Sequence, residues 1–333
     1  MSNNNVMKQL SIIIPVYNAE KYIRQCLESI YIQSLNENTF EVLIIDDGSK
    51  DKSMENIYDL TKKHHNLKII KQLNQGVSIA RNNGLKAARG TYVWFMDADD
   101  MLANNCLKRI LNIAKKNSLD ILKFDHAWLK YPCINKSCSI TSKIPPHITE
   151  CKSGQEGFIE YFNPAQGYVW QYIFRREILI DNNLQFIDHI IFCEDWIFSI
   201  SALLAAKRFM SIPLQAYIYR QHEESAIRTL SKKAMLSLNV VAEQASILLR
   251  KECLNVNSKE KMKYCIFHLL TLNLWLLAHT PKIYVHRREI IGDLKSRIPH
   301  FVQKRTFHEW KFSIYYNYCP SFYVWLRYHM NKS

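Results

Sequence analysis

Two aspartates separated by a single residue, Asp97 and Asp99, directly follow an apolar segment, and Asp100 comes next. Carboxylates this close repel one another, and a divalent cation with oxygen ligands is the simplest way to keep them ionised together. The other interpretation is that Asp99 and Asp100 only cap a helix that begins after them. The triplet Asp97-Ala98-Asp99 therefore indicates either a metal site or the start of a helix, depending on where it lies in the fold.

A second acidic pair, Asp46 and Asp47, ends another apolar run and precedes a Gly-Ser dipeptide. Asp-Gly-Ser is common in turns, so a turn alone would explain it. A carboxylate at this position could also accept the imide N–H of a uracil. Tyr17 could stack on such a base or belong to the core. Arg81 could face a phosphate or the uracil, or lie solvated on a helix surface.

The elements that would position these residues alternate along the first hundred residues. Four short runs rich in apolar and β-branched residues predict buried strands, and helical periodicity lies between them. This alternation predicts a parallel α/β sheet, in which ligands bind beyond the carboxyl ends of the strands. Both acidic clusters and the Tyr17-Asn18 pair would then converge on one cleft. The strands are expected at 10–16, 40–45, 67–70 and 91–96, and the third helix at 77–88.

The remaining sequence changes character twice. The stretch after residue 101 is less regular, with a helix expected near 103–116, a strand near 119–124 and a loop at 131–151. From about residue 231 the pattern is helical, and the chain ends in an aromatic-rich tail. Helices are expected at Ala234–Cys253, Glu260–His279 and Ile283–Arg297.

Composition describes an ordinary globular protein. The 333 residues are 48% hydrophobic and include only 8 glycines and 9 prolines, so the chain can bury a sizeable core. The polar N-terminus lacks the features of a secretory signal, which predicts a cytoplasmic protein. Nine cysteines without any Cys-x-x-Cys pair favour reduced thiols over disulfides or a zinc site.

Positive charge is concentrated in the last third of the chain. Residues 231–333 carry 17 lysines and arginines against 6 acids, while the whole chain has a net charge of +14. Such a region could bind nucleic acid or anionic lipid, or could be a solvated surface. Basic residues interleaved with Tyr and Trp suit a membrane interface, but the aromatics could equally form a helical core. The longest apolar stretch, Tyr264–Ala278, is too short to span a bilayer.

Four segments in order closely resemble bacterial glycosyltransferases of family 2 with the GT-A fold: IIIPVYNAEKYI, IIDDGSKD, NQGVSIARNNGL and GTYVWFMDADD. Weaker matches, VWQYIFRREIL and FCEDWIFSISALL, extend the resemblance to about residue 230. The resemblance implies an α/β fold with a mainly parallel central sheet flanked by helices and a helical C-terminal appendage. The expected divisions are a nucleotide-sugar-binding half at 1–102, an acceptor-binding half at 103–230, and a basic, aromatic-rich helical region at 231–333.

The same resemblance implies a UDP-sugar donor and assigns residues to it. Pro15 and Tyr17 would lie against the uridine, Asp47 would contact the uracil edge, and Asp97 would contact the ribose. Asp99 would be the direct ligand of Mn²⁺ or Mg²⁺ on the diphosphate. The rest of the expected donor site is Asn18, Glu20, Asp46, Arg81 and Ala98.

The acceptor side is implied by the later segments. Asp195 would be the general base that takes a proton from the acceptor hydroxyl, although a helix N-cap is the other interpretation of this residue. Glu194 and Trp170 would lie on the acceptor side. His222 would either complete the metal site or be an ordinary loop histidine.

These observations predict an inverting transfer of a hexose or N-acetylhexosamine from a UDP-sugar to a hydroxyl of a surface glycan or glycolipid, at the cytoplasmic face of the membrane. A nucleotidyltransferase also uses a metal and an acidic pair, but it needs a Gly-rich, basic phosphate loop that the N-terminal segment lacks. A nucleic-acid-binding protein would depend on residues 231–333 and tolerate Asp99→Asn. We expect no nucleic-acid partner.

Overall fold

The computed structural model describes residues 8–33, 35–130, 150–221, 230–302 and 306–330. The chain divides into two compact units. The first, here called the sheet unit, comprises residues 1–157, 168–189 and 198–223, and the second, the helical unit, comprises 158–167, 190–197 and 224–333. The loop expected at 131–151 lies almost entirely outside the described residues.

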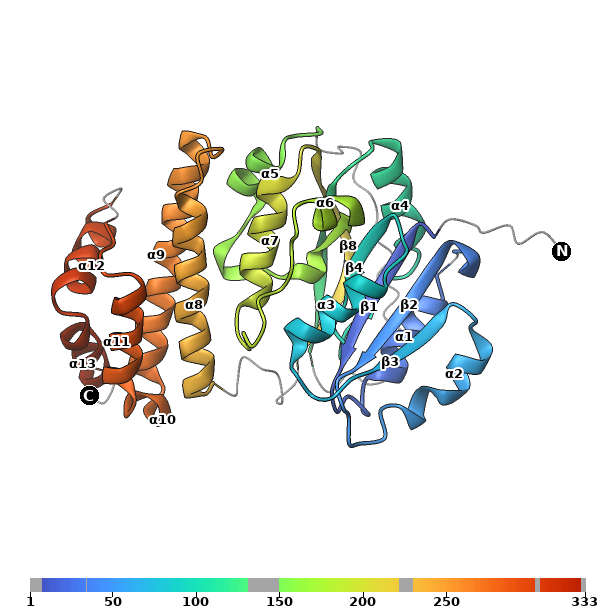
Figure 1. Ribbon diagram of the computed structural model, residues 1–333, viewed down its shortest axis with the longest axis horizontal. Helices are drawn as coiled ribbons and strands as arrows, with labels where there is room; N and C mark the ends of the chain where they lie inside the picture. The colour runs from blue at the N-terminus through green and yellow to red at the C-terminus, as the bar shows by residue number, and fades with distance from the viewer. Residues whose placement is uncertain (1–7, 34, 131–149, 222–229, 303–305, 331–333) are drawn as a thin grey trace. The chain divides into compact units, whose positions relative to one another are not determined.

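One sheet in the order β3-β2-β1-β4-β7-β6-β8-β5 organises the sheet unit (Figure 1). The first four strands in that order are parallel, β6 and β8 are parallel to each other, and β7 and β5 pair antiparallel to their neighbours. The predicted, mainly parallel sheet is therefore confirmed, with two reversed strands. The strands are β1 Leu10–Val16, β2 Phe40–Asp46, β3 Leu67–Lys71, β4 Tyr92–Phe95, β5 Met101–Leu102, β6 Ile121–Lys130, β7 Tyr172–Arg175 and β8 Phe209–Gln221.

Helices cover this sheet because successive strand residues point to opposite faces. Ile12 and Ile14 of β1 belong to the core that includes the buried sides of α1 and α4. Ile13, between them, lies against α3, which packs on β1 and β2. The helices that lie wholly or partly in this unit are α1 Ile23–Tyr31, α2 Tyr58–Lys63, α3 Val77–Ala87, α4 Leu107–Lys116, α5 Gly154–Tyr161, α6 Arg176–Asp181 and α7 Glu194–Ala205.

Three strands of the sheet have no counterpart in the sequence prediction, and one of them, β5, is only two residues long. β7 lies antiparallel between β4 and β6. Because it is only four residues long, its sequence has no periodicity that would distinguish it from α6, the helix that follows it in the chain. β8 is the long partner of β6 and pairs with it from Ile121 to Lys130. The predicted strand near 119–124 is thus only the first part of β6.

The helical unit is built around two long helices, α8 and α9, which contact each other along their lengths (Figure 1). Asn273 of α9 donates a buried hydrogen bond to Asn239 of α8 over 2.6 Å. The predicted helices are confirmed, except that the last is two helices, α10 and α11. None of the described helices is long and apolar enough to span a membrane. The helices are α8 Lys232–Leu249, α9 Val256–His279, α10 Pro281–Tyr284, α11 Arg287–Arg297, α12 Phe307–Tyr318 and α13 Pro320–Met330.

The contact between α3 and the sheet leaves no room for a side chain at Gly84. A Cβ there would lie 2.3 Å from Ile13 Cγ2 and 3.3 Å from Ile45 Cγ1. We expect Gly84→Ala to lower the free energy of unfolding by about 1–3 kcal/mol because the buried strand must shift. Gly292→Ala in α11 is the matched control, since a Cβ there meets nothing within 4 Å and alanine is the better helix former by about 1 kcal/mol. Equal urea midpoints for the two variants would contradict this packing.

Candidate functional site

The loops that follow β1 and β2 are tied together by side chains predicted to contact the donor. Asn18 Oδ1 accepts the Lys50 N–H over 2.8 Å, and Glu20 Oε2 accepts the Lys52 N–H over 3.0 Å. Asn18 takes a left-handed conformation with φ 52°. Immediately before these anchors, Tyr17 is 50% exposed, and Pro15, at the end of β1, is partly buried. Tyr17 is therefore not a core residue, and its ring is available for stacking.

Both acids at the end of β2 are buried and hydrogen-bonded to the chain. Asp46 Oδ1 accepts the Ser49 N–H over 2.9 Å. Asp47 accepts the Gln72 side-chain amide and the Gln75 and Gly76 backbone N–H groups at 2.8–2.9 Å. Asp47 thus binds the turn from which α3 begins. Its Oδ2 accepts one of these donors, so this oxygen keeps capacity for another.

Arg81 links α3 to the acidic triplet. Its side chain is 3% exposed, and Nη2 lies 2.8 Å from Asp97 Oδ1. The guanidinium also lies over the Phe186 ring, 5.2 Å from the centroid. The interpretation of Arg81 as a solvated surface residue is therefore wrong. One helix holds both acidic clusters, because the turn that leads into it binds Asp47 and its buried arginine binds Asp97.

Carboxylate oxygens of Asp97, Asp99 and Asp100 lie within 4.8 Å of one another at the end of β4. Ala98, between them, is buried. The interpretation of Asp99 and Asp100 as a helix cap is wrong, since β5 follows at Met101 and the next helix, α4, begins only at Leu107. The positions and ligand types suit a hard divalent cation.

Asp100 is the buried member of the triplet. Its Oδ2 accepts the Tyr217 hydroxyl over 2.7 Å, and its Oδ1 accepts the Arg220 N–H over 2.8 Å. Burial raises the pKa of Asp100 well above its usual value, and the charges of Asp99 and Asp97 raise it further. The Asp97 N–H also donates to the Tyr217 oxygen over 3.1 Å. Asp100 thus fastens the triplet to β8.

Sequence analysis did not identify Tyr217 or Arg220. Arg220 Nη2 donates to Gln25 Oε1 over 2.8 Å, and its guanidinium lies over the Tyr22 ring. The alternation in AYIYR, with Tyr217 and Tyr219 on one face, is the signal that could have revealed a strand here. The sequence does not reveal that this strand lies next to the triplet, because Tyr217 and Asp100 are 117 residues apart in the chain and meet only in the tertiary structure.

Trp170, expected on the acceptor side, is 1% exposed. Its carbonyl accepts the Trp94 indole N–H over 2.8 Å, which fastens η4, the 3₁₀ helix Val169–Gln171, to β4. Next to it, Gln171 Nε2 donates to His126 Nδ1 over 2.9 Å. Burial lowers the pKa of His126, which favours the neutral imidazole that can accept this hydrogen bond. Any influence of Trp170 on an acceptor must pass through the aromatic residues around it.

Glu194 and Asp195 occupy the first turn of α7, where the helix dipole favours carboxylates. Both are partly buried. They belong to segment 190–197, which is part of the helical unit, whereas the acidic triplet belongs to the sheet unit. His222 lies outside the described residues.

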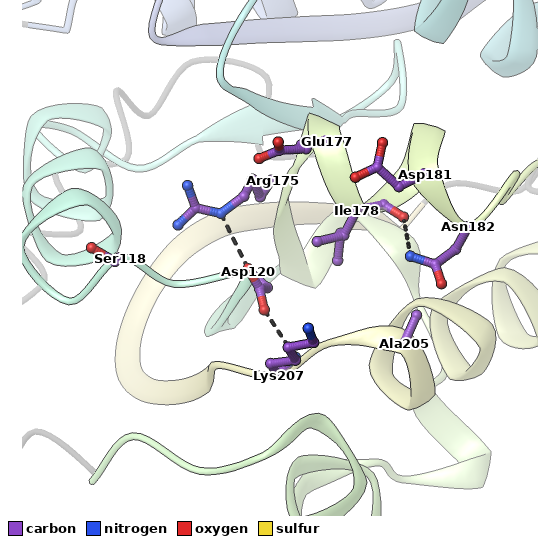
Figure 2. A pocket seen from close by; sticks show the side chains of 9 residues that line it. All are labelled: Ser118, Asp120, Arg175, Glu177, Ile178, Asp181, Asn182, Ala205 and Lys207. Atoms are coloured by element: carbon purple, nitrogen blue, oxygen red, sulfur yellow. Dashed lines mark hydrogen bonds and ion pairs between the residues drawn. The ribbon is translucent and has the colours of Figure 1, made fainter. Parts of the chain in front are cut away.

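A polar cavity of about 580 Å³ opens at the other end of the strands (Figure 2). Arg175 and Asp120 line it, and they lie where β7 ends and β6 begins. Arg175 pairs with Tyr92, the first residue of β4, whereas the triplet follows the last residue of that strand. The cavity and the triplet therefore lie at opposite ends of the strands. Arg175 Nε lies 3.1 Å from Asp120 Oδ1, and Asp120 Oδ2 accepts the Lys207 N–H. These groups neutralise one another, which is typical of a structural ion pair.

The hydrogen bond between Tyr217 and Asp100 is testable by Tyr217→Phe. We expect this variant to lose about 1–3 kcal/mol of unfolding free energy, because a buried carboxyl loses a donor. Tyr172→Phe is the matched control: Tyr172 is equally buried, and its hydroxyl makes no hydrogen bond within the described part of the chain. Urea unfolding measures both variants. Similar losses in the two would contradict a special role for Tyr217.

Residues 11–127 match the family described as Glycosyl transferase family 2. Over 321 residues the chain is 30% identical to the uncharacterized glycosyltransferase EpsJ of Bacillus subtilis, an alignment that covers 85% of this chain and 90% of EpsJ. It is also 29% identical over 220 residues to the poly(ribitol-phosphate) beta-N-acetylglucosaminyltransferase TarS of Staphylococcus aureus, covering 66% of this chain and 36% of TarS.

The fold is similar to that of residues 1–349 of S. aureus TarS, crystallised in complex with UDP-GlcNAc. The TM-score is 0.67 with 21% sequence identity, and the match covers 87% of this chain and 80% of that one. This likeness confirms the GT-A fold expected from the sequence, with a mixed central sheet flanked by helices and a helical C-terminal region.

Proposed function

The chain belongs to glycosyltransferase family 2, and we propose that it transfers a hexose or N-acetylhexosamine from a UDP-sugar to a hydroxyl of a lipid-linked surface glycan. The enzyme class follows from the family. The UDP-sugar is supported by the UDP-GlcNAc complex of TarS. A surface-glycan acceptor is supported by the poly(ribitol-phosphate) in the name of that relative.

The observation that carries this proposal is that α3 connects the ends of two strands, β2 and β4, while the end of a third strand, β1, lies between them. The turn before this helix binds Asp47 at the end of β2, and Arg81 binds Asp97 at the end of β4. Tyr17 lies exposed at the end of β1, the strand between them. A base could therefore stack on Tyr17 and meet Asp47, while its ribose and diphosphate extend toward Asp97 and Asp99. We assign Pro15, Asn18, Glu20, Asp46 and Ala98 to the walls of this site.

The acidic triplet fits a divalent cation, which we propose to be Mn²⁺ or Mg²⁺. Asp100 already accepts two hydrogen bonds and is buried, and Asp97 is engaged by Arg81. Following the family resemblance of this segment, we assign Asp99 as the direct ligand, and His222 remains a candidate second ligand. A bound cation would offset the negative charge that builds on the departing diphosphate.

The chain's own groups would carry out the remaining steps. We assign Asp195 as the general base that takes the proton of the acceptor hydroxyl, because a hydroxyl is a poor nucleophile until it loses that proton. The acceptor oxygen forms a bond to the anomeric carbon, while the bond to UDP breaks and its electron pair leaves with UDP. Attack from the face opposite UDP inverts the anomeric centre. Glu194 would help to hold the acceptor.

Asp195→Asn tests the general base. We expect UDP release from the preferred UDP-sugar to fall about 10²–10⁴-fold, the usual effect of removing such a base, with UDP affinity unchanged. Asp181→Asn, which changes an exposed carboxylate of α6, is the matched control. Wild-type turnover by Asp195→Asn across a panel of UDP-sugars would exclude this role.

Asp99→Asn tests the metal site independently of turnover. We expect this variant to bind Mn²⁺ at least about tenfold more weakly, because a neutral amide replaces an anionic ligand. Electron paramagnetic resonance titration with Mn²⁺ and UDP measures the affinity. Asp59→Asn, an exposed residue of α2 paired with Arg24, is the control. Unchanged Mn²⁺ binding by Asp99→Asn, or full turnover of the wild type in chelator, would contradict the assignment.

We further propose that the helical unit docks on anionic lipid, at the cytoplasmic face of the membrane. Helix α12 carries apolar residues on two sides. Phe312 and Tyr316 are buried, whereas Trp310, Ile314 and Tyr318, spaced four apart, are 44%, 38% and 83% exposed. The exposed apolar side chains can insert into the interfacial region of a membrane, as amphipathic helices rich in Trp and Leu-like residues do. The excess of basic over acidic residues in 231–333 supplies attraction to an anionic surface.

Ile314→Glu tests this docking. We expect binding to phosphatidylglycerol vesicles to fall at least about tenfold, because an exposed apolar anchor worth about 1.5–3 kcal/mol is replaced by a like charge to the lipid. Co-sedimentation of the full chain measures binding. Ile180→Glu is the control, since Ile180 of α6 is 52% exposed and lies in the sheet unit. Equal binding of both variants, or equal binding to phosphatidylcholine, would remove the membrane proposal.

A further inference from the structure

Strands β6 and β8 place four aromatic rings on one face of the sheet. In their parallel pairing, His126 lies opposite Tyr217 and Trp128 lies opposite Tyr219. Because side chains two residues apart point to the same side of a strand, all four rings project together. This region carries residues that the donor-site assignment leaves unused.

Trp170 joins these rings into a stack. Its ring is nearly parallel to Tyr217, with 4.3 Å between centroids and 8° between planes, and to Tyr168, at 4.7 Å and 8°. Tyr219 is also stacked against Trp170, at 5.6 Å and 23°. Trp128 meets Tyr219 edge to face at 5.0 Å. The rings therefore support one another and do not swing independently.

The stack begins in the core and ends at the surface. Trp170 and Tyr217 are fully buried, Tyr168 and Tyr219 are partly exposed, and Trp128 is 47% exposed. We call Trp128, Tyr168 and Tyr219 the aromatic surface. A large aromatic left half in water beside a rigid stack indicates a surface suited to a ligand with both apolar and polar character.

This aromatic surface adjoins the acidic triplet. Tyr217, in the stack, donates to Asp100, and the backbone N–H of Arg220, next to Tyr219, donates to the same carboxyl. Burial raises the pKa of Tyr219, and the charge of Asp100 raises it further. In the sheet order, β6 and β8 lie on one side of β4 and the strands that carry Tyr17 and Asp47 lie on the other. The aromatic surface is thus on the side away from the nucleotide.

We propose that the aromatic surface binds the terminal pyranose ring of the acceptor glycan by stacking. This inference rests on the proposed function and adds the chemical class of acceptor. One face of a pyranose ring presents C–H bonds whose hydrogens are weakly positive, and they meet the negative face of an aromatic ring. The tyrosine hydroxyls remain at the wet edge, where sugar hydroxyls can bond to them. An open-chain polyol, such as the ribitol phosphate in the name of the relative TarS, has no such ring face and would bind poorly, so this chain would share with TarS a surface polymer as acceptor but not the polyol itself.

Saturation-transfer NMR on the full chain with UDP and Mn²⁺ tests the inference. The probes are methyl β-glucoside, methyl β-galactoside and methyl N-acetyl-β-glucosaminide, with ribitol 5-phosphate as the open-chain probe. We expect transfer to the ring C–H protons of at least one pyranoside and at most about a tenth as much to ribitol 5-phosphate. Equal transfer to ribitol 5-phosphate would overturn the stacking proposal.

Variants identify the surface. Tyr168→Leu and Trp128→Leu should each weaken pyranoside binding about tenfold, while Tyr168→Phe, which keeps the ring, should stay within about threefold of wild type. Tyr58→Leu, a 62% exposed tyrosine of α2, is the matched control. Unchanged binding in both leucine variants would overturn the proposal. Thermal melting identifies a leucine variant that fails to fold, and the leucine variant that does fold then decides.

Calorimetric titration with UDP separates this inference from the proposed donor site. We expect UDP affinity to be unchanged in all four variants, because the aromatic surface lies on the other side of β4. Loss of UDP and pyranoside affinity together would assign the rings to the donor and overturn the acceptor role. Failure of the wild type to bind UDP would contradict the proposed function, while the pyranoside results would still decide the stacking.

Discussion

The arrangement of the site depends on one buried carboxyl, Asp100. It sits between the hydroxyl of Tyr217 and the backbone N–H of Arg220, so the loop after β4 and the strand β8 must move together. Burying a carboxyl is costly unless it is hydrogen-bonded or neutral, and two neighbouring aspartates add to that cost. The fold meets it with two donors from β8 and a raised pKa. This attachment of Asp100 to β8 also determines where the neighbouring Asp97 and Asp99 lie.

A second set of constraints acts through α3. Asp47 binds the turn that begins this helix, and Arg81 ties it to Asp97, so the acids after β2 and β4 cannot shift independently. The close approach of the helix at Gly84 keeps α3 against β1. Such preorganisation favours a site in which charge develops on a bound group, because little reorganisation is then needed during the reaction. The stacked rings around Trp170 are constrained in a similar way, because the buried rings pack against the more exposed aromatic side chains and restrict their movement.

Several features of this fold were predictable because they arise locally. The strands of LSIIIPV and FEVLII, the helix after Gln75-Gly76, and the acids at strand ends depend on side-chain pattern and on the geometry of parallel sheets. Strand β7 was not predictable, because four residues reverse direction only to fill the space between β4 and β6. The break between α10 and α11 was also missed, since the apolar pattern runs through both helices.

By itself, the sequence determined which residue types end the strands, the order of the family segments, and the excess of basic residues in the last third. It left two interpretations open for Arg81, a residue that contacts the donor or a solvated surface residue, and two for Asp99, a metal ligand or a helix cap. Only the tertiary structure decided that Arg81 is buried against Asp97 and that no helix begins at Asp100. The physical reason is distance along the chain. Tyr217 and Trp170 reach the triplet through strand pairing and ring stacking, and neither interaction leaves a local pattern near Asp97.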